Sequence, residues 1–275
     1  MERIADPLNA MDARVSLREG CAPIRIRASR GGLSAIKYRL PVASAQVKSC
    51  VLLAGLFANG TTEVIEPVPA RDHTERMLDL RIQEVGGGRH IYVEGGTSIP
   101  ASTWTIPGDF SGAAFFLVAA TLLPDSELTI QDVGLNPSRT ALLDVLRGMG
   151  ADITVRNERV EGGEPVGDLV VRSAELEGVD IGGRLIPNLI DEIPVIAVAA
   201  ACADGTSEIR DAHELRVKET DRLHAITENL RALGAEVDEQ EDGLTIEGRG
   251  PNLLGTDVHS FDDHRIAMAM GVAGL

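Results

Sequence analysis

Aromatic residues are scarce in this sequence: Phe, Trp and Tyr together make up 3% of the 275 residues, whereas apolar residues reach 44%. The hydrophobic cores must therefore be built mainly from Ala, Val, Leu and Ile. Basic residues are outnumbered too, and the net charge of −16 argues against a nucleic-acid binder, which needs a basic face. An anionic small molecule stays compatible with this charge, because a few Arg and Lys side chains in a cleft reverse the local field.

Cysteines are also few, and Cys21, Cys50 and Cys202 show no C-x-x-C spacing. We therefore expect no disulfide framework and no metal site, and a reducing cytoplasmic location. The apolar runs at 113–123 and 193–203 are shorter than the roughly 18 residues of a membrane span. The first residues lead into no apolar signal region, so we expect neither membrane association nor secretion.

A glycine-rich dinucleotide motif is missing as well. No G-x-G-x-x-G run follows a predicted strand, although the chain has 29 glycines. A Rossmann-type cofactor site is therefore not favoured.

The sequence does contain an internal repeat. Three times an Ala/Val/Leu-rich stretch runs into a turn and then into a short alternating run, at residues 59–64, 125–130 and 204–209. A polar entry and a second apolar-periodic segment follow each run. A fourth copy begins at 262–265, just before the chain stops. Such repetition indicates one supersecondary unit used several times, the last of them cut short.

The pattern within each copy predicts a β-α-β-α-β-β unit. Its first helix, at 47–58, 113–123 or 194–203, is nearly free of polar residues, which is typical of a helix surrounded by other elements. The second helix is amphipathic, and in two copies we expect it to end where Gly150 or Gly234 takes the left-handed conformation.

Polar clusters stand at the starts of the predicted central helices. Ser44, Ala45 and Gln46 precede one helix, and a helix N-terminus with neutral donors suits a phosphate, although Ser44 alone reads first as a helix cap. Asp191 and Glu192 open another, where acids commonly serve the helix dipole but a carboxylate could also act as a general base.

Two further clusters carry mixed charges. Lys218 and Arg222 are four residues apart, which predicts one helical face, with Glu219 and Asp221 interleaved. Such a face is most often solvated and salt-bridged, but two cations could also hold an anion beside a carboxylate that moves a proton. The run at 262–265 precedes a fourth apolar helix. Clusters at the same end of repeated helices can converge in space, and this convergence is the main argument for a site.

With these residues assembled, the chain resembles the 5-enolpyruvylshikimate-3-phosphate (EPSP) synthases. The resemblance runs along essentially the whole chain, and the Arg-Val-Lys-Glu-Thr-Asp-Arg-Leu run is highly specific to that family. The matching segments are 40–49, 71–78, 107–111, 191–194, 216–223 and 263–265.

The resemblance implies an α/β fold, a two-domain inside-out α/β barrel built of repeated βαβαββ units, here truncated at both ends. It implies a partial N-terminal domain over 1–107 and a C-terminal domain over 108–275, incomplete at its end. For the full-length protein, the resemblance implies a monomer that needs no cofactor. It also implies that shikimate 3-phosphate and phosphoenolpyruvate bind in the cleft between the domains.

The resemblance also implies roles for individual residues. Ser44, the backbone of Ala45, Gln46 and Arg71 would bind the phosphate of shikimate 3-phosphate. Asp191 and Lys218 would hold its ring hydroxyls, and Asp191 would act as the base on the 5-hydroxyl. Gln46, Arg222 and Arg265, with His264 alongside, would hold phosphoenolpyruvate, and Glu219 would transfer a proton at its methylene carbon.

Parts of the family pattern are absent. An N-terminal segment with a Lys-Ser pair and Arg residues, and a later Lys, have no counterpart here, and Ala70 stands where many members have Ser. These gaps remove cationic ligands, so we expect a truncated piece with weak or no turnover by itself.

Two alternative functions stay open at this stage. UDP-N-acetylglucosamine enolpyruvyltransferases share the implied fold and chemistry, but the run from Lys218 to Leu223 favours the shikimate enzyme. A non-catalytic repeat fragment that binds an anion would belong to a different class. It would leave the joint match of Asp191, Glu219, Arg222 and Arg265 unexplained.

Overall fold

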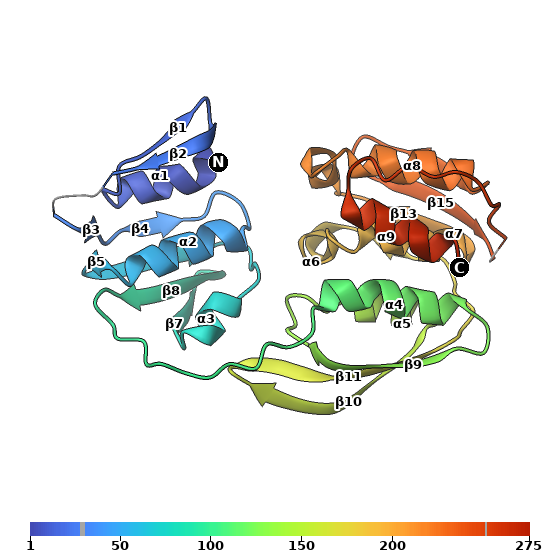
Figure 1. The fold of residues 1–275 in the computed structure, drawn as a ribbon, viewed down its shortest axis with the longest axis horizontal. Helices are drawn as coiled ribbons and strands as arrows, with labels where there is room; N and C mark the ends of the chain where they lie inside the picture. The colour runs from blue at the N-terminus through green and yellow to red at the C-terminus, as the bar shows by residue number, and fades with distance from the viewer. Residues whose placement is uncertain (28–30, 251) are drawn as a thin grey trace. The chain divides into compact units, whose positions relative to one another are not determined.

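The structure, a computed structural model, describes residues 1–27, 31–250 and 252–275. The chain forms two compact units (Figure 1). Unit 1 comprises Met1–Thr105 with Gly162–Glu164, and unit 2 comprises Ile106–Glu161 with Pro165–Leu275. Each unit has its own hydrophobic core.

Unit 1 contains three helices and eight strands within the described residues. In chain order they are α1 (Glu2–Ala10), β1 (Val15–Arg18), β2 (Cys21–Ile26), β3 (Leu33–Ser34), β4 (Lys37–Arg39), α2 (Ala45–Gly55), β5 (Ala58–Asn59), β6 (Thr61–Glu66), α3 (His73–Met77), β7 (Arg81–Val85) and β8 (Gly88–Glu94).

The main sheet of unit 1 has the strand order β4-β6-β8-β7. β4 runs parallel to β6, and β8 is antiparallel to both β6 and β7. Helix α2 packs on β6 and β8, and α1 packs on α2. Strand β6 buries Thr62 and Val64 toward this helix, as its alternating sequence predicts.

Unit 2 contains the remaining elements. They are α4 (Phe110–Leu122), β9 (Glu127–Gly134), α5 (Ala141–Gly148), β10 (Asp152–Glu161), β11 (Glu164–Arg172), β12 (Asp180–Ile181), the 3₁₀ helix η1 (Gly183–Leu185), α6 (Ile186–Leu189), α7 (Ile193–Ala201), β13 (Asp204–Ile209), the 3₁₀ helix η2 (His213–Val217), α8 (Arg222–Ala232), β14 (Glu236–Glu239), β15 (Leu244–Arg249) and α9 (His264–Ala273).

The two sheets of unit 2 repeat the order found in unit 1. One sheet has the order β12-β13-β15-β14, with β12 parallel to β13 and β15 antiparallel to β13 and β14. The other has the order β9-β11-β10, and a parallel bridge from Gly108 to Val133 takes the place of its first strand. The predicted β-α-β-α-β-β unit and the α/β fold class are therefore confirmed.

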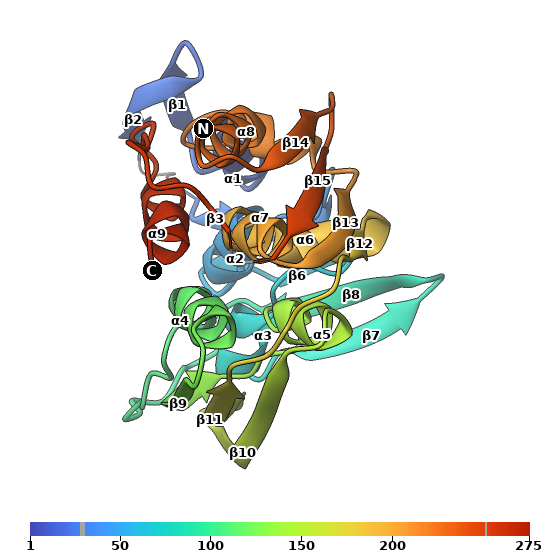
Figure 2. The ribbon, with the colours of Figure 1, turned by 90° about the vertical axis from the view of Figure 1, so that its right-hand side faces the viewer.

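Helix α7 lies at the centre of unit 2. All nine of its residues are buried, and it packs against α4, α8 and α9 (Figure 2). Six of the seven residues from Val195 to Ala201 are Ala or Val, and these small side chains let the neighbouring helices approach closely. The prediction of a surrounded central helix is thus confirmed for this copy.

The equivalent helices α2 and α4 are less covered. Leu53 on α2, Phe57 just after it and Phe116 on α4 are exposed. Within the described residues, no other element covers these side chains, so the prediction of a fully surrounded helix is wrong for these two copies. None of the helices in the described parts of the chain is long and apolar enough to cross a membrane.

The amphipathic helices α5 and α8 end as their sequences predict. Gly150 and Gly234 have φ values of +104° and +87°, in the left-handed region that glycine adopts without strain. The chain then enters β10 and β14.

Close backbone approach explains the glycine in β15. A Cβ atom on Gly248 would lie 2.4 Å from the carbonyl oxygen of Ala200 and 2.5 Å from that of Ala203. We expect Gly248→Ala to lower the free energy of unfolding by about 1–3 kcal/mol, because β15 must move away from the end of α7. Chemical denaturation measures this change. The matched control is Gly255→Ala, where a Cβ would meet nothing within 4 Å, and an equal loss in both variants would contradict the explanation.

Candidate functional site

In unit 1, Ser44 is the N-cap of α2. Its Oγ accepts the backbone N–H of Val47 at 3.4 Å, so the interpretation of Ser44 as a cap is confirmed. The first N–H groups of a helix have no acceptor within it, so Ala45 and Gln46 present donors at this end. The Gln46 side chain is exposed and accepts a hydrogen bond from Arg3 Nη2 at 3.3 Å.

Sequence reasoning missed a buried ionic cluster one turn further along α2. Lys48 Nζ lies 2.7 Å from Glu66 Oε1 and 2.8 Å from Glu75 Oε1, and all three side chains are almost completely buried. Lys48 also donates to the carbonyl oxygen of Ala70 at 3.2 Å, and Glu66 accepts the N–H of Ala70 at 2.8 Å. The available signal was a lysine inside an otherwise apolar helix.

This cluster fixes the segment that carries Arg71. Both backbone polar groups of Ala70 are held by Lys48 and Glu66, so the half-buried Arg71 follows an anchored residue. The substitution of Ala for Ser at position 70 leaves these backbone bonds in place, because neither of them uses the side chain.

In unit 2, residues at the starts of α7, α8 and α9 come together. Asp191 Oδ1 lies 3.6 Å from Arg222 Nη1 and 3.7 Å from Arg265 Nε. The carbonyl oxygen of Asp191 accepts a hydrogen bond from Arg265 Nη1 at 3.1 Å. The convergence that the repeat predicted is therefore present for these three residues.

Arg222 is the most enclosed member of this group, with 1% of its side chain exposed. Its Nε donates to Asp263 Oδ2 at 2.8 Å, and its Nη2 donates to Glu219 Oε2 at 2.6 Å. Its Nη1 makes no hydrogen bond to the described residues. A buried guanidinium nitrogen without an acceptor is costly, so this atom is suited to an acceptor supplied by a ligand.

Asp263 connects Arg222 to α9. Its Oδ1 caps that helix by accepting the N–H of Arg265 at 2.8 Å and that of Ile266 at 3.4 Å. Burial by itself would raise the pKa of this carboxyl, but the bonds from Arg222 and from the two N–H groups together hold the pKa below its ordinary value. Asp263 therefore stays ionised as the partner of Arg222, and His264 is left exposed in the first turn.

The prediction that Lys218 and Arg222 share a helical face is wrong. Asp221 is the N-cap of α8 and accepts the N–H of His224 at 3.1 Å, so the helix begins only at Arg222. Lys218 instead follows η2, and its Nζ lies 2.5 Å from Glu214 Oε1. Glu219 precedes the cap and keeps half of its side chain exposed.

A second polar group beside Asp191 was not recognised in the sequence. Glu192 is buried and accepts a hydrogen bond from the hydroxyl of Ser111, on the first turn of α4. Arg139 Nη2 donates to the same hydroxyl oxygen at 2.5 Å and lies 3.4 Å from Asp109 Oδ1. Glu192 had been noted only as an acid in a first turn, and its partners are 81 and 53 residues away along the chain.

Burial raises the pKa of Glu192, while the bond from Ser111 and the charge of Arg139 oppose that rise. A carboxyl whose folded-state pKa is raised holds its proton more tightly in the folded protein. Its contribution to stability is therefore lost as the pH rises from the unfolded pKa through the folded one. Because Gln does not titrate, we expect the free energy of unfolding of Glu192→Gln to fall less than that of the wild type as the pH rises. Chemical denaturation of both proteins at pH 4 and pH 7 measures this. If the free energy of unfolding changed equally between the two pH values in the variant and in the wild type, the expectation would be contradicted.

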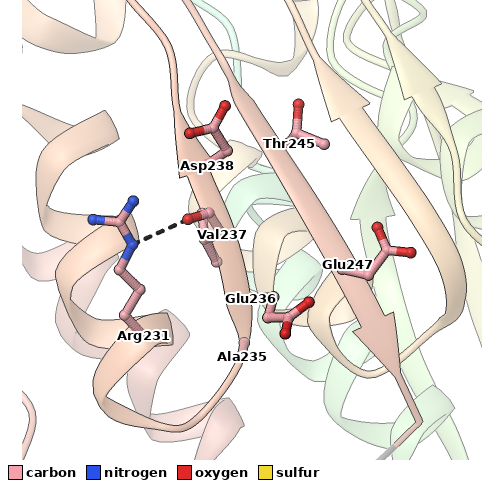
Figure 3. A pocket seen from close by; sticks show the side chains of 7 residues that line it. All are labelled: Arg231, Ala235, Glu236, Val237, Asp238, Thr245 and Glu247. Atoms are coloured by element: carbon pink, nitrogen blue, oxygen red, sulfur yellow. Dashed lines mark hydrogen bonds between the residues drawn. The ribbon is translucent and has the colours of Figure 1, made fainter.

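One surface groove lies away from all these residues. It has a volume of about 440 Å³ and is bounded by α8, β14 and β15 (Figure 3). Glu236, Asp238 and Glu247 line it, and Arg231 donates its Nε–H to the carbonyl oxygen of Val237 at 3.0 Å. Three carboxylates repel an anionic substrate. Among the described residues, no three His, Cys, Asp or Glu side chains are arranged to hold a metal ion.

Comparison with solved structures places this fold in a class. The enolpyruvyl transferase NikO from Streptomyces tendae matches 99% of the chain with a TM-score of 0.74 at 20% identity, and the chain covers 64% of it. EPSP synthase from Acinetobacter baumannii matches the whole chain with a TM-score of 0.88 at 42% identity, and the chain again covers 64% of it. The fold is therefore that of the enolpyruvyl transferases.

Sequence comparison then defines the family. The pattern of EPSP synthase (3-phosphoshikimate 1-carboxyvinyltransferase) matches residues 1–275. The 3-phosphoshikimate 1-carboxyvinyltransferase of Salinibacter ruber is 76% identical over 276 residues, and that of a Synechococcus species is 55% identical over 280 residues. This chain belongs to the EPSP synthase family. It spans 64% and 62% of the length of these two relatives.

Proposed function

We propose that this chain carries out enolpyruvyl transfer as part of a full-length enzyme. The reaction moves the enolpyruvyl group of phosphoenolpyruvate to the 5-hydroxyl of shikimate 3-phosphate and releases phosphate, a step of the shikimate pathway. The observation that carries the proposal is the buried Arg222, whose Nη1 has no hydrogen-bond partner among the described residues and faces Asp191 at 3.6 Å. The two substrates are proposed on the basis of family membership.

In unit 1, the start of α2 is the proposed phosphate-binding element. Backbone N–H groups at a helix N-terminus together with the dipole favour an anion, and Ser44, Ala45 and Gln46 form that terminus. Arg71 would add a positive charge. Its backbone neighbour Ala70 is anchored by Lys48, which reduces the entropy lost when the substrate binds.

In unit 2, Asp191 is the proposed base for the 5-hydroxyl, and Lys218 would contact the ring hydroxyls. Arg222 and Arg265, with His264, would bind phosphoenolpyruvate. Guanidinium groups suit this ligand because they hold carboxylate and phosphate oxygens through paired hydrogen bonds.

Glu219 is the proposed proton donor to the methylene carbon. Asp191, Glu219 and Asp263 face Arg222 and Arg265, so three carboxylates against two guanidinium groups leave one net negative charge when all are ionised. Of the three carboxylates, Glu219 has the most exposed side chain, and it lies 2.6 Å from Arg222 Nη2.

The proposed chemistry has two steps. The 5-hydroxyl oxygen bonds to C2 of phosphoenolpyruvate while its proton passes to Asp191 and Glu219 protonates the methylene carbon. The tetrahedral intermediate then returns a methyl proton to a carboxylate, and phosphate leaves with the electron pair of its C–O bond. Positioning by the cations and proton transfer by the carboxylates supply the catalysis.

The same proposal assigns residues 1–107 to a partial N-terminal domain and 108–275 to a C-terminal domain. It takes the full-length enzyme to be a cytoplasmic monomer without a cofactor.

The test uses a full-length chimera, in which this chain replaces the matching 276 residues of the Salinibacter ruber relative. Phosphate release from phosphoenolpyruvate is measured with and without shikimate 3-phosphate. Release that requires shikimate 3-phosphate supports the proposal. A folded chimera that releases no phosphate would contradict it, because the remaining residues come from the relative itself.

A further inference from the structure

A chain of hydrogen bonds joins the start of α4 to the start of α7. It runs from Arg139 through the hydroxyl of Ser111 to the carboxylate of Glu192. Ser111 and Glu192 are each 2% exposed, so the hydrogen bond between them is shielded from water. Its members lie in two successive repeats of unit 2.

The direction of these bonds is fixed by their chemistry. A guanidinium group has no acceptor, so Arg139 must donate to the Ser111 oxygen. The single hydroxyl proton of Ser111 is then available for Glu192, which accepts it. Bonds with charged ends are shorter and stronger than neutral ones, so this arrangement resists rotation of the Glu192 side chain.

Helix capping does not explain why Glu192 is buried. Glu192 occupies the N-cap position of α7 but its side chain accepts no N–H of that helix. Burial of a carboxylate costs free energy that a neutral side chain would avoid. The residue therefore points to a function other than the stability of α7.

Its sequence neighbour supplies that function. The backbone around residues 191–192 is held from two sides, because Glu192 N–H donates to Leu189 O at 2.8 Å and Asp191 O accepts from Arg265. With Glu192 directed toward α4, the Asp191 side chain is directed toward α8 and α9, where its Oδ1 lies 3.6 and 3.7 Å from the two guanidinium groups.

We propose that Glu192 is a positioning residue, held by Ser111 and Arg139, which fixes the carboxylate of Asp191 between Arg222 and Arg265. The proposal rests on the function proposed for Asp191 above. The charged groups around Glu192 are Arg139 and Asp109 near α4 and α5, its neighbour Asp191, and Arg265 on α9.

The first test needs no catalysis. In the 275-residue chain, the NMR signal of the Arg265 Nε–H group reports the nearby Asp191 carboxylate. We expect Ser111→Ala and Glu192→Ala to shift this signal. The matched control is Thr121→Val, which removes another buried hydroxyl of α4, one that donates to Leu117 O at 2.8 Å within the same helix. An Arg265 signal unchanged by both alanine variants would overturn the proposal.

The second test separates positioning from folding in the full-length chimera. Small displacements of a catalytic group cost up to about 100-fold in rate. We therefore expect Ser111→Ala and Glu192→Ala to lower kcat by about 10- to 100-fold with little change in either KM. Glu192→Gln keeps an acceptor for Ser111 and should recover most of that loss, and Thr121→Val should leave kcat unchanged.

The outcomes distinguish the two proposals. Alanine variants with the kcat of the parent chimera would overturn the positioning role. A parent chimera without phosphate release would instead contradict the proposed function, while the NMR arm would still decide whether Glu192 positions Asp191. If Ser111→Ala fails to fold, the comparison of Glu192→Ala with Glu192→Gln decides.

Discussion

Substitution of Asp191 by Asn is expected to lower kcat of the full-length chimera by about 100- to 10,000-fold, the range for removal of a general base. The amide keeps the size of the side chain but cannot take the proton of the 5-hydroxyl. KM for phosphoenolpyruvate should change little, because Arg222 and Arg265 remain in place. Steady-state phosphate release measures both constants.

The control for this variant is Asp238→Asn, an acid of the surface groove that faces no proposed ligand. It should leave kcat unchanged. If Asp191→Asn folds and keeps the turnover of the parent chimera, Asp191 is not the base, and a non-catalytic module becomes the better account of this chain.

Replacement of Lys48 by Met is expected to lower the free energy of unfolding of unit 1 by about 3–5 kcal/mol, the usual cost of removing one partner of a buried ion pair. The carboxylates of Glu66 and Glu75 would stay buried, and each would lose the ammonium group of Lys48 as its partner. Arg89 Nη1, at 3.4 Å from Glu66 Oε2, offsets only part of this loss. Denaturant titration measures the change.

The matched control is Lys37→Met. Lys37 pairs with Glu63 at 3.0 Å, but 63% of its side chain is exposed, and such pairs contribute about 1 kcal/mol or less. Equal losses in the two lysine variants would contradict the account of the buried cluster.

The repeat was predictable from sequence because its signals are local. Apolar stretches, alternating runs and the glycines at 150 and 234 each report on a few neighbouring residues, and the structure has the elements there. The family motifs likewise located the segments around Asp191, Arg222 and Arg265, which the structure brings together in unit 2.

What the sequence could not provide depends on contacts between distant segments. Glu192 meets Ser111 across 81 residues, and Lys48 meets Ala70 across 22, so no local pattern records either bond. The prediction for Lys218 was wrong for another reason. Spacing of four predicts a shared helical face only if the helix is continuous, and the cap at Asp221 starts the helix after Lys218.

The exposed apolar side chains on α4 and at the end of α2 illustrate the same limit. A nearly polar-free helix indicates burial, but composition does not say whether every face has a neighbour within the chain. Phe57 is 78% exposed and Phe116 is 62% exposed, whereas the equally apolar α7 is fully buried.

We propose that Asp191, Arg222 and Arg265 form the reactive part of an enolpyruvyl transferase. The most direct test is mass spectrometry of the product formed by the full-length chimera from shikimate 3-phosphate and phosphoenolpyruvate, with Arg222→Met in parallel. We expect an enolpyruvyl ether of shikimate 3-phosphate with the parent chimera and at most a trace with the variant. The same yield of product from both proteins would contradict it.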